Sequence, residues 1–101
     1  MSELRDRVVV LTGAAGNVGT SAAKAFDAAG ARVVLVDHSA EHVKKRLGEL
    51  ATRHRIEEVD LGDETGVRDR FAAVRADLGR IDALVTSVGG YVGGNPVANT
   101  A

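Results

Sequence analysis

Short hydrophobic runs alternate with longer amphipathic stretches along most of the chain. Continuous runs of valine and leucine occupy residues 8–11 and 33–36, and a shorter apolar run occupies 83–85; the segment from Ile56 to Val59 is a shorter candidate strand. Runs of this length, apolar at successive positions, are typical of strands that are covered on both faces of a parallel sheet. The pattern therefore predicts four strands.

Each gap between the predicted strands has the periodicity of a helix. Apolar residues recur on one helical face in three stripes: Val18, Ala22, Ala25, Phe26 and Ala29; Val43, Leu47 and Leu50; Val67, Phe71, Val74 and Leu78. Ser39 and Asp63 precede the second and third stripes as N-cap residues do, and Gly30 and Gly79 follow the first and third as C-terminal glycines do. We therefore predict three helices between the strands.

The resulting order is β-α-β-α-β-α-β, in which crossover helices imply parallel strands and right-handed connections. This is an α/β, Rossmann-like half of a doubly wound parallel sheet, with expected strand order 3-2-1-4 and a crevice between strands 1 and 4. All charged residues lie within residues 1–82, and the last residues are rich in glycine. We therefore predict a nucleotide-binding half-domain over 1–88 and a glycine-rich loop or tail over 89–101.

Composition narrows the function classes. The chain has 101 residues, of which 45% are hydrophobic and 27% charged, and its net charge is −1. This balance disfavours a disordered tail and gives no electrostatic reason to expect nucleic acid as a partner. The chain has no cysteine, and no apolar run approaches membrane length. We expect no disulfide, no thiolate metal site and no membrane insertion, and we expect a cytoplasmic location.

A glycine-rich turn joins the first strand to the first helix. It reads Thr12-Gly13-Ala14-Ala15-Gly16-Asn17-Val18-Gly19. Gly13 permits a tight turn, a glycine near the helix start admits a pyrophosphate, and Gly19 allows the helix to pack closely on the strand. The helix N-terminus then offers N–H groups and the positive end of its dipole to the anion. The context of strand, glycines and helix predicts dinucleotide binding.

Two carboxylates are predicted at the same edge of the sheet. Asp37 ends the second strand, eighteen residues after Gly19, where a carboxylate accepts the ribose hydroxyls of NAD and repels the 2′-phosphate of NADP. His38 and Arg32 are the nearby residues that favour NADP, and neither outweighs Asp37. Asp60 follows the third strand and either reaches the adenine amino group or caps the next turn.

These motifs together resemble the short-chain dehydrogenase/reductase family. The matching pieces are Thr12-Gly13-x-x-Gly16-x-x-Gly19, Asp37, Asp60-Leu61, and Gly79-Arg80-Ile81-Asp82-Ala83-Leu84-Val85 leading to Gly89. The resemblance implies that the turn holds the NAD(P) pyrophosphate, that the acid after strand two sets cofactor preference, and that the segment after strand four lines the ribose near the nicotinamide. With the turn, it assigns to the cofactor Gly13, Ala15, Gly16, Asn17, Val18, Gly19, Asp37, His38, Asp60, Leu61, Ser87, Val88 and Gly89.

The sequence departs from the family pattern at two points. Asn17 stands where the single-domain branch has a glycine; asparagine tolerates a positive φ better than most residues, so the turn is expected to survive. After strand four, Thr86-Ser87-Val88-Gly89 replaces the family's Asn-Asn-Ala-Gly, so only the glycine is kept. The Gly13, Gly16, Gly19 spacing also fits the extended branch of nucleotide-sugar epimerases and dehydratases.

The catalytic residues of the family have no counterpart in these 101 residues. The family uses a Ser and a Tyr-x-x-x-Lys pair, whereas Tyr91, the single tyrosine, is followed four residues later by Asn95. We assign no catalytic residue and expect a cofactor-binding portion of an NAD-dependent oxidoreductase that is inactive alone. A non-catalytic nucleotide-binding or assembly module and a fragment of an extended-branch epimerase are the alternatives. Because the fourth strand would be an open apolar edge, we expect self-association or a partner chain that covers it.

The basic residues and histidines suggest no second site. We predict that the solvated side of the second helix and its exit carry five basic residues: Lys44, Lys45, Arg46, Arg53 and Arg55. Nearby glutamates offset the positive charge of these residues. His38 and His42 lack a convincing third ligand, and His54 lies a strand away, so we assign no metal site.

Overall fold

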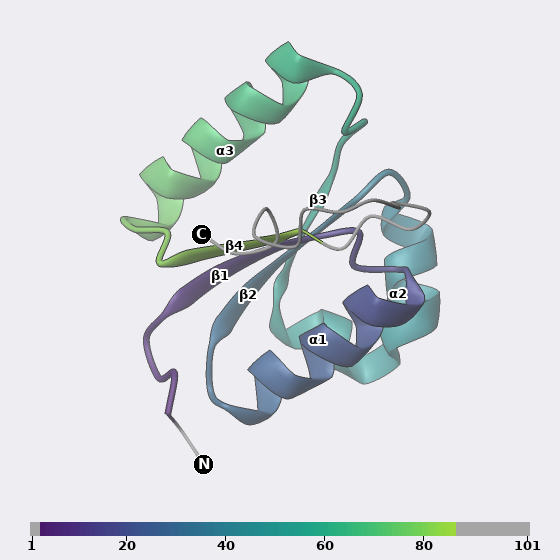
Figure 1. Cartoon of the computed structure of the whole chain (residues 1–101), viewed down its shortest axis with the longest axis vertical. Helices are drawn as coiled ribbons and strands as arrows, with labels where there is room; N and C mark the ends of the chain where they lie inside the picture. Colours follow the sequence, from purple (N-terminus) through teal and green to yellow (C-terminus); the bar gives the residue numbers. More distant parts are fainter. Residues whose placement is uncertain (1–2, 87–101) are drawn as a thin grey trace, which may run out of the picture.

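The predicted alternation of strands and helices is confirmed in the computed structural model, which describes residues 3–86 (Figure 1). The elements are β1 (Val8–Thr12), α1 (Asn17–Ala28), β2 (Arg32–Asp37), α2 (Ala40–Leu47), the 3₁₀ helix η1 (Gly48–Arg53), β3 (Arg55–Glu58), α3 (Glu64–Leu78) and β4 (Ala83–Thr86). The four strands form one parallel sheet in the predicted order β3-β2-β1-β4. The predicted boundary at residue 88 lies outside the described residues.

Alternate residues of the central strands build two hydrophobic cores. Val9 and Leu11 on β1, with Val33 and Leu35 on β2, face a core that includes residues of α1, α2 and η1. The intervening residues of the same strands face a second core that contains Val74 of α3. Figure 1 shows α1 and α2 on one side of the sheet and α3 on the other. Strands covered on both faces explain the unbroken apolar runs in the sequence.

Ionic contacts fix the outer strands to their neighbours. The Asp82 carboxylate just before β4 accepts a hydrogen bond from the Val8 amide at 2.7 Å, and hydrogen bonds from Arg80 and Val8 lower the pKa of Asp82. On β3, the buried Glu57 carboxylate contacts Arg55 and Arg70, the latter from α3. Burial raises the pKa of Glu57, but the hydrogen bonds and charges of these arginines outweigh it, so the net change is downward.

The second helix differs from the prediction at its C-terminal end. The stripe Val43, Leu47, Leu50 predicts one helix, whereas α2 stops at Leu47 and η1 continues to Arg53. Gly48 interrupts the α-helix because its φ of 58° and ψ of −128° are not helical. Leu50 still reaches the core from the tighter η1 turn.

The third helix is less buried than its stripe predicts. Val74 is buried, while Val67, Phe71 and Leu78 pack only partly against the sheet.

Within residues 3–86, no helix combines the length and the apolar character that crossing a bilayer requires.

Candidate cofactor-binding site

The glycine-rich turn lies at the carboxyl edge of the sheet, next to the point where the strand order reverses. The chain leaves β1 toward β2 on one side, while β4 pairs with β1 on the other. This switch point is where open α/β sheets bind ligands. The Thr12 hydroxyl at the end of β1 is buried and has no hydrogen-bond partner among residues 3–86.

The turn is tight because β2 and α1 hold it closely. The amides of Gly13 and Ala14 donate to the Val36 carbonyl at 2.9 and 3.2 Å, and Gly13 has a φ of 72°. A Cβ on Gly19 would lie 2.0 Å from the Gly13 carbonyl oxygen, so only glycine allows α1 to approach this near. A Cβ on Gly16 would lie 3.4 Å from the same oxygen, an ordinary contact distance. The sequence-based role of Gly19 is therefore visible in the geometry.

The first turn of α1 presents, at the carboxyl edge of the sheet, amide donors that have no acceptor within the described residues 3–86. Gly16 is the N-cap and supplies no side chain, and the turn contains no acidic residue. The first helical amide with an acceptor among the described residues is that of Thr20, which donates to the Gly16 carbonyl at 2.8 Å. The amides of Asn17, Val18 and Gly19 are thus available to an anion, which the helix dipole also favours. Val18 is 69% exposed beside them.

Asp37 lies directly against this turn. Its carboxylate is buried, with Oδ2 accepting from the Ala15 amide at 3.0 Å and Oδ1 accepting from the Ser39 amide at 3.4 Å. The exposed His38 places Nδ1 3.0 Å from Asp37 Oδ1. The structure thus brings together Ala15, Asp37 and His38, which the sequence analysis assigned to one site.

Arg46 is exposed, in agreement with the prediction that the basic residues lie on the solvated side of α2, but it also contacts the glycine-rich turn. Its Nη1 donates to the Ala15 carbonyl and its Nη2 to the Asn17 side-chain oxygen, both at 3.0 Å. Arg53 and Arg55 are also paired, with Asp27 and with Glu57 and Asp77 respectively. Sequence reasoning missed Arg46 because its two partners, Ala15 and Asn17, lie 31 and 29 positions away along the chain, and no local pattern marks such distant contacts.

The sequence analysis expected Asn17 to tolerate a positive φ, but Asn17 does not adopt one. It is the first residue of α1, and among the described non-glycine residues only Asp6 has a positive φ. The turn therefore tolerates the missing glycine because a helical backbone conformation at this position does not require glycine.

The structure gives less support to the remaining residues that the sequence analysis assigned to the cofactor. Asp60 is exposed, and its Oδ1 accepts from the Gly62 amide at 2.8 Å, so in this structure it caps the turn after β3. Leu61 is 37% exposed. Ser87, Val88 and Gly89, like Tyr91, lie outside the described residues.

The histidines do not converge. His54 is buried and joins two elements, because its Nδ1 accepts from the Val33 amide at 3.1 Å and its Nε2 lies 2.8 Å from Asp27 Oδ1. Hydrogen bonds from Arg53, and next from His54, lower the pKa of Asp27. Over residues 3–86, no three histidine or acidic side chains gather in a way that could hold a metal ion.

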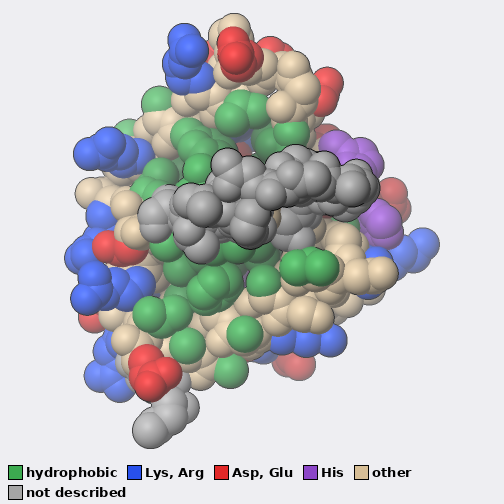
Figure 2. Space-filling model, in the orientation of Figure 1, with side chains coloured by type: hydrophobic (Ala, Val, Ile, Leu, Met, Phe, Trp, Pro, Cys, Tyr) green, Lys and Arg blue, Asp and Glu red, His purple; other side chains and the backbone are tan. Residues whose placement is uncertain are grey.

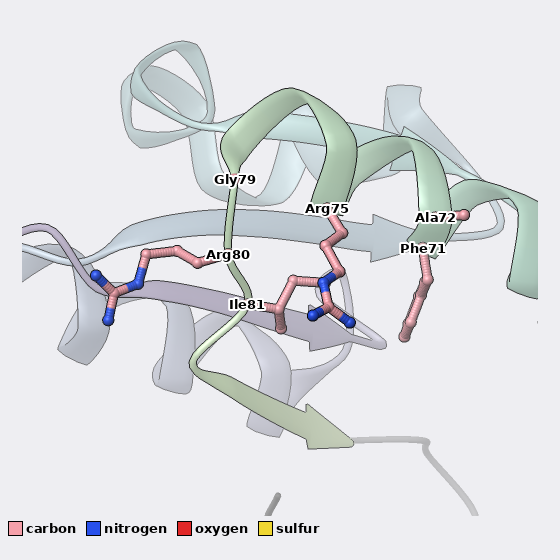
Figure 3. Close-up of a pocket in the computed structure, with 6 residues that line it drawn as sticks. All are labelled: Phe71, Ala72, Arg75, Gly79, Arg80 and Ile81. Atoms are coloured by element: carbon pink, nitrogen blue, oxygen red, sulfur yellow. The ribbon is translucent and has the colours of Figure 1, made fainter.

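A cavity of about 580 Å³ lies away from this site (Figure 3). Phe71, Ala72 and Arg75 line it from α3, and Gly79, Arg80 and Ile81 from the link that precedes β4. That link enters the amino end of β4, whereas the glycine-rich turn follows the carboxyl end of β1. The cavity therefore lies on the side of the sheet that α3 covers, whereas the glycine-rich turn leads into α1 on the other side (Figure 1).

Comparison with known proteins agrees with this geometry. A family model described as short chain dehydrogenase matches residues 7–100. The chain is 38% identical over 91 residues to meso-2,3-butanediol dehydrogenase of Serratia marcescens. This match covers 89% of the present chain and 36% of the relative. The chain therefore spans about a third of the length of this curated relative.

Solved structures show the same fold. A protein from Brucella melitensis described as a short-chain dehydrogenase/reductase, glucose/ribitol dehydrogenase, superposes with a TM-score of 0.78 at 33% identity, over 89% of this chain and 39% of that chain. A 3-ketoacyl-(acyl-carrier-protein) reductase from the same organism, complexed with NADH, superposes with a TM-score of 0.71 at 30% identity. That match covers 80% of this chain and 33% of the reductase.

Proposed function

The chain belongs to the short-chain dehydrogenase family, and on that premise we propose that it binds NAD as the cofactor-binding portion of an oxidoreductase. The observation that carries the proposal is the contact of Gly19 with the Gly13 carbonyl. This close approach supports the proposal because it brings the first-turn amides of α1, which have no acceptor among residues 3–86, to the switch point where such sheets bind ligands. The buried Thr12 hydroxyl, unpartnered within the described residues, adds a polar group at that point.

We assign the adenosine ribose to Asp37. Its carboxylate is fixed against the turn by the Ala15 amide, with His38 beside it. A carboxylate held there accepts the ribose hydroxyls and repels a 2′-phosphate. This charge favours NAD over NADP, in spite of the basic side chains of His38 and Arg46 nearby.

The cofactor supplies hydride transfer when it is bound, and the residues of this chain bind and orient it. The family's Tyr-x-x-x-Lys pair does not occur in these 101 residues, since Asn95 stands four positions after Tyr91. We therefore propose that the 101-residue chain binds NAD without turning over a substrate. A cytoplasmic location, which the sequence predicts, stays a prediction. The relatives reported above are dehydrogenases and a reductase, which favours an oxidoreductase over an epimerase.

Titration with NADH and NADPH, followed by nicotinamide fluorescence, tests this function. We expect saturable binding of NADH and weaker binding of NADPH. Asp37→Asn, which keeps an oxygen for the Ala15 amide but removes the charge, should weaken NADH binding by roughly tenfold and narrow the preference over NADPH. Asp69→Asn, at an exposed position on α3, is the matched control and should change neither constant. A flat NADH titration by protein with native circular dichroism would falsify the proposal.

A second candidate function, as an assembly module, is favoured by the edge strand. All four residues of β4 are only half-buried, whereas all five of β1 are buried. Figure 2 shows hydrophobic side chains gathered on the face where β4 lies in Figure 1. An open apolar edge invites strand pairing, so we propose self-association or a partner chain at β4. Light scattering that finds a monomer at high concentration would count against this role.

A further inference from the structure

The backbone of Ala15, at the centre of the glycine-rich turn, is held on both sides of its Cα. The Ala15 amide donates to Asp37 on β2, and the Ala15 carbonyl accepts from Arg46 on α2, both at 3.0 Å. Ala15 is buried, and it has no side-chain polar group of its own. The two peptide groups that flank Ala15 are therefore each oriented by a charged side chain from another element. Hydrogen bonds to charged groups are stronger than neutral ones.

The same guanidinium also orients Asn17. Because arginine carries only donors, the Asn17 oxygen must face Arg46, and its amide nitrogen must point elsewhere. Asn17 opens α1, beside the amides of Val18 and Gly19. One arginine thus links α2 to both the carbonyl inside the turn and the first residue of the helix.

We propose that Arg46 is a positioning residue of the cofactor site. It fixes the Ala15 carbonyl, and through the Ala15 backbone the amide that holds the Asp37 carboxylate, and it fixes the start of α1, whose amides receive the pyrophosphate. This inference rests on the proposed binding of NAD and deepens it. Arg46 also secures the turn at Asn17, where the single-domain branch has a glycine.

The geometry requires an arginine rather than any cation. Two nitrogens of one planar group reach two acceptors on different residues. A lysine offers one ammonium group on a flexible stem and cannot hold both acceptors in this way. The neighbouring Lys45 is exposed and carries the same charge, which makes it a matched control position on α2.

NADH titrations of the 101-residue chain test this role with four variants: Arg46→Ala, Arg46→Lys, Asn17→Gly and Lys45→Ala. We expect Arg46→Ala to raise the NADH dissociation constant by about tenfold, with a melting temperature close to that of the wild type. Arg46→Lys should recover less than half of the loss, and Lys45→Ala should stay within about twofold of the wild type. In the Asn17→Gly background, Arg46→Ala should cost less than it does alone, because one of its two acceptors is gone.

The outcomes separate this inference from the proposed function. If the wild type does not bind NADH, the proposed function fails. If the wild type binds and Arg46→Ala matches Lys45→Ala, the positioning role fails alone. If Arg46→Lys binds as tightly as the wild type, Arg46 acts through its charge and the positioning role is overturned. Equal losses of melting temperature and affinity in Arg46→Ala and Arg46→Lys, with no dependence on Asn17, would overturn it as well.

Discussion

Replacing Gly19 with alanine tests the close approach on which the cofactor site depends. The added Cβ would lie 2.0 Å from the Gly13 oxygen, 2.9 Å from the Gly13 carbon and 3.0 Å from the Ala14 Cα. All three obstacles are backbone atoms, so no side-chain rotation relieves the contact. Restoring an ordinary contact of 3.4 Å requires α1 to move about 1.4 Å from the turn.

The expected loss follows from two opposing contributions. Overpacking a well-filled region costs about 1–3 kcal/mol, and rigid backbone obstacles place this variant at the upper end. Alanine is favoured over glycine inside a helix by about 1 kcal/mol, which offsets part of the cost. The net effect is a loss of about 2 kcal/mol in the free energy of unfolding. For a domain of this size that loss lowers the melting temperature by about 8–16 °C.

Gly16→Ala is the control within the same turn. Its Cβ would meet the Gly13 oxygen at 3.4 Å, and its φ of −77° suits alanine. The free energy of unfolding, measured by urea titration and circular dichroism, should fall by no more than about 1 kcal/mol, because alanine is a poorer N-cap residue than glycine. The contrast between two glycines three residues apart therefore isolates the contact from the general effect of removing a glycine.

Equal stability of Gly19→Ala and the wild type would refute this reasoning. A loss in Gly16→Ala as large as in Gly19→Ala would refute it too, because the cost would then come from backbone freedom rather than from the contact. NADH titration adds a second measurement. A displaced α1 moves its first-turn amides away from the pyrophosphate, so Gly19→Ala should also bind NADH more weakly.

Two further predictions concern stability away from the cofactor site. Asp27→Asn should lower the free energy of unfolding at neutral pH by about 1–2 kcal/mol, since the buried His54 ring loses its charged partner. The pKa of Asp27 is lowered in the folded chain, so the stability that the Asp27 carboxylate contributes is fully present above the ordinary value of 3.8. That stability is lost as the pH falls through the folded-state pKa of Asp27. Urea titrations of the variant and the wild type should therefore converge in acid, and a constant difference down to the acid limit would contradict the assignment. Gly79→Ala should lower the melting temperature by about 4–8 °C, because Gly79 caps α3 with a φ of 83° and has no neighbour that a Cβ would strike. Gly79→Asn should recover part of that loss, and a melting temperature unchanged by alanine would contradict it.

The fold was largely predictable because its signals are local. Buried parallel strands need apolar residues at successive positions, and β1 and β2 supply them without interruption. Ser39 and Asp63 were identified as caps, and each side chain does accept a hydrogen bond from a helix amide. The end of α2 was not predictable from the apolar stripe, because Leu50 stays buried whether the turn that carries it is α or 3₁₀.

The candidate site was predictable only in part, because several of its contacts join distant residues. The glycines and Asp37 follow from spacing within a strand–turn–helix unit, and the family resemblance supports them. Arg46 carries no such signal: within the sequence it is one of three adjacent basic residues on a polar stretch. Its contact with the turn exists only after α2 has crossed back over the sheet.

The position of Arg46 also explains why the turn can depart from the family pattern without losing its shape. A glycine at position 17 would leave the carbonyl of Ala15 as the one acceptor for α2, whereas Asn17 supplies a second. Two acceptors held by one rigid fork constrain the start of α1 more than either does alone. The cost is that a side chain now occupies space near the helix N-terminus, and its oxygen must be turned away from any bound phosphate. Arg46 donates a hydrogen bond to that oxygen, so the pair leaves only hydrogen-bond donors to face the anion. Asn17 is therefore expected to be compatible with a phosphate site only in company with a donor on α2.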